Sequence, residues 1–433
     1  MLVKPNIPPG GWNSYDCFRN TLNEEQALAN LAAFVDKLKP FGFEYFVIDA
    51  GWHAKYSFAE LPAHGGRQER FIDEWGRFVG SPTFFPHGLR AIADACHAAG
   101  VKFGMHLMRG IPALAVERNT PIKGHSTARA RDILDPAHNS SWCDYNRAVN
   151  MSAPGAREYY ASVAEYLLDD IQVDFIKFDD ATEYPEEIKA LAEALDRNPR
   201  PVALSLSEGN SISTLGWDFY SRYAAMVRVT CDIWDLEDHA EPRYDRWWAF
   251  ENCDNSTCHI DLDMLPLGAL QVNVPAGTPE DAEPMGHCRA SRLDEIYKKV
   301  LVTQHALARS PLFFGGDLVT SAQSDIDLVT HPEVLACNRD GVAGKQVFLW
   351  RHIDVRRAES ASRPGHGWLG VFMREWGARN MRTEFFTPAD LGFADAANAP
   401  ESLTDIWADK TVRLENGRYG IDVPPKGCAF LKY

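Results

Sequence analysis

The chain has 433 residues, which is longer than one ordinary domain. Hydrophobic residues make up 45% of it and aromatic residues 11%, enough to fill large cores. The formal net charge of −16 argues against binding to nucleic acid or to an anionic membrane surface. No run of about 18 apolar residues is present, so no membrane span is expected.

The first three quarters of the chain alternate strands with helices. Eight stretches have the apolar, β-forming character of short strands: residues 10–15, 43–49, 101–106, 173–180, 201–206, 226–231, 261–265 and 311–314. Stretches with helical apolar spacing lie between several of them: residues 24–38, 89–99, 154–170, 185–195 and 293–307. This alternation predicts βαβ units and a parallel sheet, and eight strands predict a (β/α)₈ TIM barrel. An open doubly wound sheet is the alternative, which the lack of a glycine-rich phosphate loop weakens.

The pattern changes after about residue 340. Short candidate strands separated by turns follow, without a long helical pattern, at residues 347–350, 367–372, 382–386, 412–414 and 428–431. We therefore expect a catalytic barrel over residues 1–340 and a C-terminal antiparallel β-sandwich domain over residues 341–433.

The strand at residues 173–180, Val-Asp-Phe-Ile-Lys-Phe-Asp-Asp, runs from apolar residues into charge. Lys177 and Asp179 are two apart, so they point to the same side of the strand. The lysine should lower the pKa of Asp179 and keep it ionised, which suits a carboxylate nucleophile. An ordinary ion pair at the end of a strand is the alternative interpretation.

Five predicted strands, the one at residues 173–180 included, end in a carboxylate or are followed closely by one. These carboxylates are Asp49, Asp179, Glu208, Asp232 and Asp263. Arg228 precedes Asp232 by four residues, so both can face one side of an extended segment. Two carboxylates facing one cavity are what glycoside hydrolysis needs, one to attack the anomeric carbon and one to protonate the leaving oxygen. Aromatic residues at neighbouring strand ends, Trp12, Tyr15 and Trp52, are candidates to stack on a sugar, although the two tryptophans fit a core equally well.

Eight motifs follow one another along the predicted barrel. They are Pro-Pro-Gly-Gly-Trp-Asn-Ser-Tyr (8–15), Phe-Val-Ile-Asp-Ala-Gly-Trp (46–52), Phe-Pro-His-Gly-Leu (85–89), Lys-Phe-Gly-Met-His (102–106), Asp-Phe-Ile-Lys-Phe-Asp (174–179), Arg-Val-Thr-Cys-Asp (228–232), Asp-Leu-Asp-Met-Leu (261–265) and Ser-Pro-Leu-Phe-Phe-Gly-Gly (310–316). Their order is that found in glycoside hydrolase family 27, so the chain resembles this family of clan D, which holds retaining α-galactosidases and α-N-acetylgalactosaminidases.

The resemblance implies roles for individual residues. Asp179 resembles the family's nucleophile and Asp232 its acid/base, which must hold a proton through a raised pKa. Retention requires the two carboxyl groups to lie about 5–5.5 Å apart. The remaining site positions implied by the resemblance are the sugar ligands Lys177, Asp49 and Arg228, the pocket residues Trp12 and Asp263, and Tyr15 and His106, which stand where a tryptophan and a tyrosine are common.

The sequence departs from the family pattern where it decides the sugar. Ala50 replaces the second of two consecutive aspartates and removes one acceptor for sugar hydroxyls. Glu208 is typical of galactosidases, whereas the small Ser211 is typical of N-acetylgalactosaminidases. We expect a retaining exo-acting α-galactosidase. An α-N-acetylgalactosaminidase or a β-L-arabinopyranosidase is the alternative, and a non-catalytic sugar-binding barrel or a barrel isomerase or lyase belongs to a different class.

The cysteines and the start of the chain bear on the cellular compartment and on whether a cofactor is expected. The nine cysteines are scattered, without zinc spacing, and the start of the chain has no apolar secretory core. We therefore expect reduced thiols, a cytoplasmic location and neither a metal nor an organic cofactor. The expected partner is an oligosaccharide or glycoside substrate, and a homo-oligomer stays open.

Overall fold

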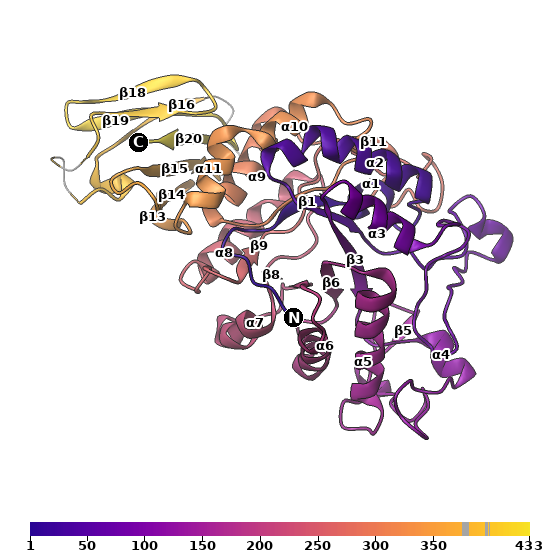
Figure 1. The fold of residues 1–433 in the computed structure, drawn as a ribbon. Helices are drawn as coiled ribbons and strands as arrows, with labels where there is room; N and C mark the ends of the chain where they lie inside the picture. Colours follow the sequence, from indigo (N-terminus) through magenta and orange to yellow (C-terminus); the bar gives the residue numbers. More distant parts are fainter. Residues whose placement is uncertain (375–380, 395–396, 398) are drawn as a thin grey trace.

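The computed structural model describes residues 1–374, 381–394, 397 and 399–433. Its N-terminal part is a parallel sheet curled into a barrel, with helices around it (Figure 1). The barrel strands are β1 (Gly10–Asn13), β2 (Tyr45–Ile48), β3 (Lys102–Met108), β6 (Phe175–Asp179), β7 (Ala203–Leu206), β8 (Met226–Arg228), β9 (His259–Asp261) and β12 (Leu312–Phe314). The predicted (β/α)₈ barrel is confirmed.

Strand order follows the chain around the barrel, because each strand pairs in parallel with the next and β12 pairs with β1. The ring closes between the segment after β9 and β12 through a single parallel bridge that joins Leu265 to Phe314. Strands such as β2 are buried over their whole length, since side chains fill the barrel interior on one face and helices cover the other. This double burial explains the continuous apolar runs in the sequence.

Helices connect the strands and cover the outside of the sheet. They are α2 (Glu24–Lys37), α3 (Leu89–Ala98), α5 (Ala156–Glu165), α6 (Pro185–Arg197), α7 (Trp217–Tyr223), α8 (Glu241–Phe250) and α9 (Glu295–Ala308), with the short α1 (Tyr15–Phe18) and α4 (Ala113–Arg118) in loops. Asn23 and Gln26 form a reciprocal capping box that starts α2. After β12 come α10 (Gln323–Thr330) and α11 (Pro332–Asp340), which the sequence analysis did not predict.

The C-terminal part is an antiparallel β domain. Its strands are β13 (Lys345–Trp350), β14 (Ile353–Glu359), β15 (Gly367–Met373), β16 (Arg382–Phe386), β17 (Ser402–Asp405), β18 (Lys410–Glu415), β19 (Arg418–Val423) and β20 (Cys428–Lys432). They form one sheet in the order β13-β14-β15-β20-β17-β18-β19-β16. The sheet folds over its own hydrophobic core, and Phe348 of one edge strand contacts Phe386 of the other at 6.1 Å between ring centroids. The predicted antiparallel domain is confirmed.

Two details of the strand prediction need correction. The seventh barrel strand is β9, which ends at Asp261, and the stretch up to Leu265 continues as irregular backbone with a positive φ at Asp263. Strands β14, β17 and β19 were missed. In β14 the charged residues Asp354 and Arg356 are fully buried, so its sequence lacks the apolar pattern that marks a core strand.

Arg356 joins the two parts of the protein. Its guanidinium pairs with Asp354 at 2.9 Å, donates to the carbonyl of Tyr244 in α8 at 3.1 Å, and lies 4.3 Å from the ring centroid of Trp247. Trp247 in turn donates to the carbonyl of Gly344 at the start of the β domain. The predicted boundary at residue 340 falls where α11 ends, just before β13 begins at Lys345.

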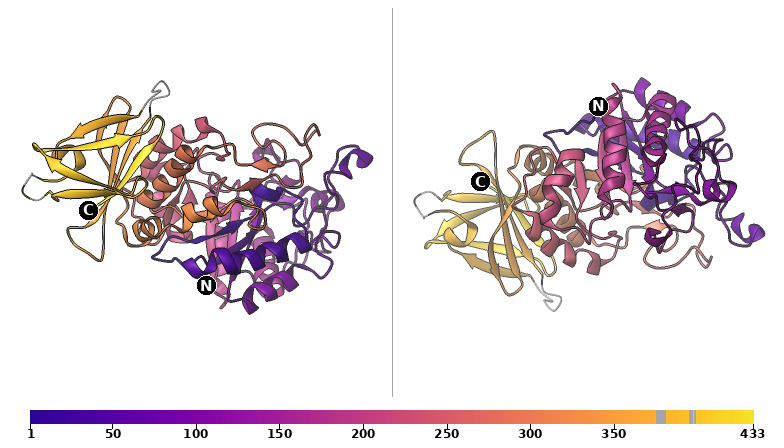
Figure 2. Two further views of the ribbon diagram at one scale, coloured as in Figure 1. Left: turned by 90° about the horizontal axis from the view of Figure 1, so that it is seen from above. Right: turned by 90° about the horizontal axis from the view of Figure 1, so that it is seen from below.

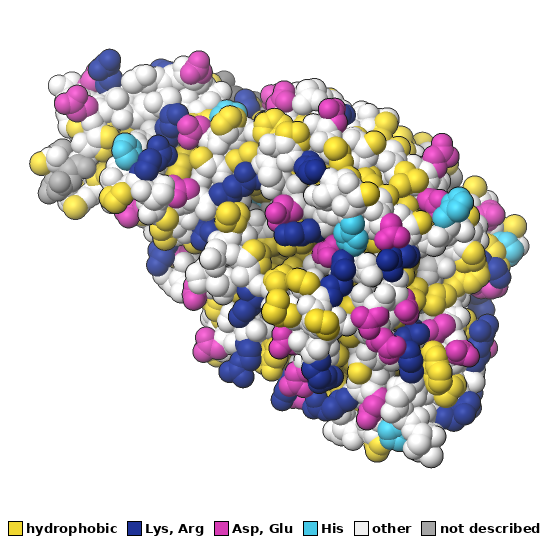
Figure 3. Space-filling view, viewed as in Figure 1, with side chains coloured by type: hydrophobic (Ala, Val, Ile, Leu, Met, Phe, Trp, Pro, Cys, Tyr) yellow, Lys and Arg dark blue, Asp and Glu magenta, His cyan; other side chains and the backbone are white. Residues whose placement is uncertain are grey.

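On the face drawn in Figure 3, acidic and basic side chains are interspersed, and neither sign of charge is concentrated in one patch. Within the described ranges, none of the helices combines the length and the apolar character that a membrane crossing demands.

The buried pair in β14 predicts a stability effect. We expect Arg356→Leu to lower the free energy of unfolding by about 3 kcal/mol, because it leaves Asp354 buried with weaker compensation. The double variant Asp354→Leu/Arg356→Leu should recover part of that loss. Urea unfolding checks both, and Arg413→Leu, at an exposed position of β18, should change the free energy by less than about 0.5 kcal/mol. Equal losses in the single and double variants would contradict this account.

Candidate active site

The candidate site lies at the carboxyl ends of the barrel strands. Long loops rise from this end after β2 and β3, and in Figure 2 they occupy the opposite end of the molecule from the C-terminal β domain. Active sites of (β/α)₈ barrels are built at this face from strand ends and loops. All five strand-end carboxylates of the sequence analysis follow or end strands here.

Asp179 is the last residue of β6, and its carboxylate is held by neighbours on three sides. His106 Nε2 lies 3.2 Å from Oδ2, and Ser207 Oγ and the backbone N–H of Asp180 each donate to Oδ1 at 3.0 Å. Burial raises the pKa of Asp179, but the hydrogen bond with His106 and the charges of Lys177 and Arg228 outweigh it, so the net pKa is well below its usual range. The predicted lowering is confirmed in direction, with His106 as the additional cause.

Lys177 lies in the same strand as Asp179 and reaches Asp49, which follows β2, two strands away in the barrel. Its Nζ donates to Asp49 Oδ2 at 2.9 Å, and Asn13 donates to the same oxygen at 2.7 Å. Asp49 is nearly inaccessible, and its Oδ1 accepts from the N–H of Ala50 at 2.8 Å. Burial lowers the pKa of Lys177, while Asp49 and Asp179 raise it to a net value above its ordinary one, so the ammonium keeps its proton.

Arg228 is shared by three carboxylates. Its guanidinium lies 2.7 Å from Asp232 Oδ1, 3.4 Å from Asp263 Oδ1 and 3.8 Å from Glu208 Oε2. The three acids differ in accessibility: the side chain of Asp263 is 5% exposed, that of Glu208 49% and that of Asp232 58%. One cation cannot neutralise three anions, and burial together with this excess negative charge raises the pKa of Glu208.

A close backbone contact fixes the loop that carries Glu208. A Cβ atom on Gly209 would lie 1.2 Å from the carbonyl oxygen of Arg228, so only glycine fits between the two strand ends. Arg246 donates to the carbonyl of Gly209 at 2.9 Å, and Thr182 donates to that of Glu208. The loop therefore presents Glu208 beside Arg228 and leaves Ser211 exposed.

Two predicted aromatic contacts need correction. Trp12 is 0% exposed, stacks on Phe46 and donates to the carbonyl of Gly316, and Trp52 is 2% exposed and donates to the carbonyl of His106 at 2.8 Å. Both rings are core residues that hold strand ends in place, so neither offers a free face to a sugar. Tyr15 is half-buried, with its ring centroid 5.8 Å from Lys177 Nζ.

No group of three histidine, cysteine, aspartate or glutamate side chains in the described ranges is arranged to hold a metal ion.

The chain is similar to known glycosidases in sequence and in structure. The structure resembles that of a family 27 β-L-arabinopyranosidase from Geobacillus stearothermophilus, with a TM-score of 0.86, 29% identity and coverage of 99% of this chain and 96% of that one. Alpha-galactosidase 2 of Arabidopsis thaliana is 26% identical over 97% of this chain and 88% of its own length. An α-galactosidase of Lachancea cidri is 23% identical, and the match covers 80% of this chain and 64% of that protein. No family model matches the sequence.

The chain resembles enzymes of glycoside hydrolase family 27 in sequence and in structure. The enzyme is a glycosidase, and its substrates are glycosides.

Several site residues of this glycosidase escaped the sequence analysis. Asn13 and Ser207 bind Asp49 and Asp179 directly, and both lie inside stretches that were noted for other residues. Asp180, with a positive φ, binds Arg109 at 2.8 Å and Trp142 at 3.2 Å, which fixes the backbone after Asp179. A neutral amide or hydroxyl leaves no charge pattern in the sequence. Asn13 and Ser207 are therefore recognised as site residues only by their position beside the carboxylates.

Asp261, which is buried at the end of β9, predicts a pH dependence of stability. Burial and the adjacent charge of Asp263 raise the pKa of Asp261 to about 7. The folded state therefore keeps a proton that the unfolded chain loses near pH 4, and this contribution to stability is lost as the pH rises through 7.

We expect Asp261→Asn, whose amide oxygen still accepts from the N–H of Asp263, to gain about 2 kcal/mol relative to the wild type between pH 5.5 and pH 8. Urea unfolding at the two pH values measures this difference. A difference between the two proteins that does not change with pH would rule out Asp261 as the titrating group.

Proposed function

We propose that this enzyme is a retaining exo-glycosidase that removes terminal α-galactosyl residues by double displacement. The observation that carries the proposal is the contrast between two carboxylates at one barrel mouth. Asp179 is largely buried and held ionised by His106, Lys177 and Arg228, whereas the side chain of Asp232 is 58% exposed and pairs with Arg228. Two carboxyl groups in different environments are the requirement for an acid/base and a nucleophile to act together.

In the first step Asp179 attacks the anomeric carbon and forms a glycosyl ester, while Asp232 gives its proton to the departing glycosidic oxygen. In the second step Asp232 takes a proton from water, whose oxygen attacks the same carbon and releases Asp179 as a carboxylate. Asp232 thus regains in the second step the proton that it gave up in the first, and the cycle closes. Lys177 supplies a donor for sugar hydroxyls, and the nearly inaccessible Asp49 holds its ammonium in place.

A second candidate sugar is β-L-arabinopyranose. It has the ring hydroxyl configuration of α-D-galactose but lacks the hydroxymethyl group at C5. Ala50 is half-buried and adds no side-chain acceptor beside Asp49. A hydroxymethyl group that is buried there without an acceptor loses a hydrogen bond, whereas the arabinoside has no such group to satisfy. The likeness to the Geobacillus enzyme supports the same candidate.

Glu208 favours either sugar over N-acetylgalactosamine. Its carboxylate lies on the rim beside Arg228, where it can accept a hydrogen bond from a hydroxyl at C2. An acetamido group at that position needs more volume and meets a charged side chain. A cytoplasmic location remains part of the proposal, supported by the scattered cysteines, all nine of which are free.

Removing either carboxylate should separate the two roles. Asp179→Gly should lose at least about 10⁴-fold in kcat, and added azide should yield a β-configured glycosyl azide. Asp232→Ala should still form the glycosyl-enzyme from substrates with good leaving groups. Product analysis by NMR and burst kinetics measure these outcomes. Wild-type-like activity of Asp179→Gly would overturn the assignment, as would an inverted configuration of the first product.

The choice of sugar can be tested at position 50. We expect Ala50→Asp to raise the ratio of kcat/KM for p-nitrophenyl α-galactoside to that for the β-L-arabinopyranoside by about tenfold, because a new acceptor is worth roughly one hydrogen bond. Ala50→Leu, which adds bulk without an acceptor, should not raise the ratio. If Ala50→Asp changes both substrates equally, position 50 does not face C5.

A further inference from the structure

Asp232 lies on a segment that regular secondary structure does not support. The backbone is irregular between the end of β8 at Arg228 and the short 3₁₀ helix η6 (Glu237–His239). The side chain of Asp232 is 58% exposed, and its carboxylate pairs with Arg228 at 2.7 Å. A group that transfers a proton to one particular oxygen needs a fixed position, so other contacts have to hold this segment in place.

The buried carboxylate of Asp263 holds the segment on both sides of Asp232. Its Oδ2 accepts from the backbone N–H of Ile233, the residue directly after Asp232, at 2.7 Å. Its Oδ1 lies 3.4 Å from the guanidinium of Arg228, which is the partner of Asp232. One carboxylate thus fixes both the backbone that follows Asp232 and the cation that pairs with it. Hydrogen bonds to an ionised acceptor are among the stronger ones in proteins.

The oxygens of Asp263 are largely occupied by donors from the protein itself. Besides Ile233 and Arg228, the backbone N–H of Met264 donates to Oδ1 at 2.8 Å. A carboxylate offers about four acceptor positions, so these three donors leave little capacity for a sugar hydroxyl. The side chain is also only 5% exposed. These contacts indicate that Asp263 acts on the segment of Asp232 rather than on the sugar.

Asp263 is itself held by the barrel core. Its φ of 78° lies in the left-handed region, which aspartate and asparagine adopt more readily than most residues. Its N–H donates to Asp261 Oδ1 at 2.8 Å, and its carbonyl oxygen lies 2.9 Å from Nε2 of His305 in α9. Asp263 therefore passes a position that is set in the core to an exposed side chain.

We propose that Asp263 is the positioning residue of the acid/base Asp232. By holding the N–H of Ile233 and the guanidinium of Arg228, it keeps the carboxyl group of Asp232 directed at the glycosidic oxygen. Loss of Asp263 should therefore weaken proton transfer to the leaving group more than it weakens attack by Asp179. This inference rests on the proposed function, which assigns the acid/base role to Asp232.

The test compares two glycosides of the same candidate sugar. The 2,4-dinitrophenyl glycoside has a leaving group that departs without a proton, whereas the leaving oxygen of the phenyl glycoside needs one. The measured quantity is the ratio of kcat/KM for the dinitrophenyl substrate to that for the phenyl substrate. Asp232→Ala should raise this ratio by about 10²- to 10⁴-fold, the usual contribution of general acid catalysis. Asp263→Asn, which turns one acceptor oxygen into a donor, should raise it by about tenfold, the effect of roughly one hydrogen bond.

A double variant tests whether Asp263 acts through Asp232. In an Asp232→Ala background, Asp263→Asn should not raise the ratio any further, because there is no acid left to position. Asp49→Asn is the matched control, since Asp49 is as deeply buried as Asp263 but pairs with Lys177 instead of Arg228. It should lower kcat/KM for both substrates alike and leave the ratio unchanged.

Three results would decide against these assignments. If Asp263→Asn lowers kcat/KM for both substrates equally, or still raises the ratio in the Asp232→Ala background, Asp263 does not position Asp232. Should Asp263→Asn fail to fold, Asp263→Gly, whose backbone takes a φ of 78° without strain, is judged by the same two criteria. If Asp232→Ala itself leaves the ratio unchanged, Asp232 is not the acid, and the proposed function fails instead.

Discussion

Two cations, Lys177 and Arg228, compensate the negative charge of the carboxylates at the barrel mouth of this glycosidase. A carboxylate taken out of water without a partner is costly enough that it would take up a proton or move. Lys177 compensates Asp49 directly and Asp179 through space, and Arg228 compensates Asp232, Asp263 and Glu208. Because both cations come from rigid strands, they give the five acids at the strand ends fixed partners.

The compensation is uneven, and this unevenness provides chemical function. The hydrogen bond with His106 and the charges of Lys177 and Arg228 outweigh burial, so the pKa of Asp179 lies well below its usual range. Burial, together with the excess of negative charge around Arg228, raises the pKa values of Glu208 and Asp261. The edge of the mouth at Asp179 therefore favours a carboxylate, whereas Glu208 and Asp261 near Arg228 favour the protonated form.

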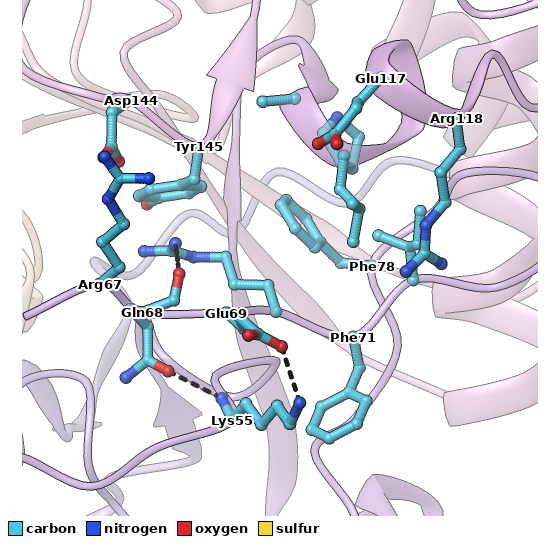
Figure 4. Close-up of a pocket in the computed structure, with 15 residues that line it drawn as sticks. Lys55, Arg67, Gln68, Glu69, Phe71, Phe78, Glu117, Arg118, Asp144 and Tyr145 are labelled. Atoms are coloured by element: carbon cyan, nitrogen blue, oxygen red, sulfur yellow. Dashed lines mark hydrogen bonds and ion pairs between the residues drawn. The ribbon is translucent and has the colours of Figure 1, made fainter. Parts of the chain in front are cut away.

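The rest of the molecule supports the mouth from both sides. The C-terminal β domain packs on α8 and α9 through buried groups such as Arg356, far from the long loops (Figure 1). The loops after β2 and β3 line a cavity with side chains such as Tyr145 and Arg70 (Figure 4). Strand ends thus hold the carboxylates, while such loops generally vary more than the strands that they connect.

The sequence by itself determined the order of the barrel strands and the charged residues at their ends. Alternating apolar strands and helices gave the barrel, and Lys177–Asp179 and Arg228–Asp232 gave charged pairs at the right spacing, because periodicity and charge are local properties. Strand β14 escaped because its buried ion pair disrupts the apolar pattern that local reasoning depends on.

Only the tertiary structure decided which groups meet. Asn13, Ser207 and His106 bind the carboxylates across strands that are 28 to 73 residues apart in the chain, a relation that no local pattern contains. It also placed Trp12 and Trp52 in the core, since whether an aromatic ring at a strand end faces a ligand or a neighbouring strand depends on packing from distant segments.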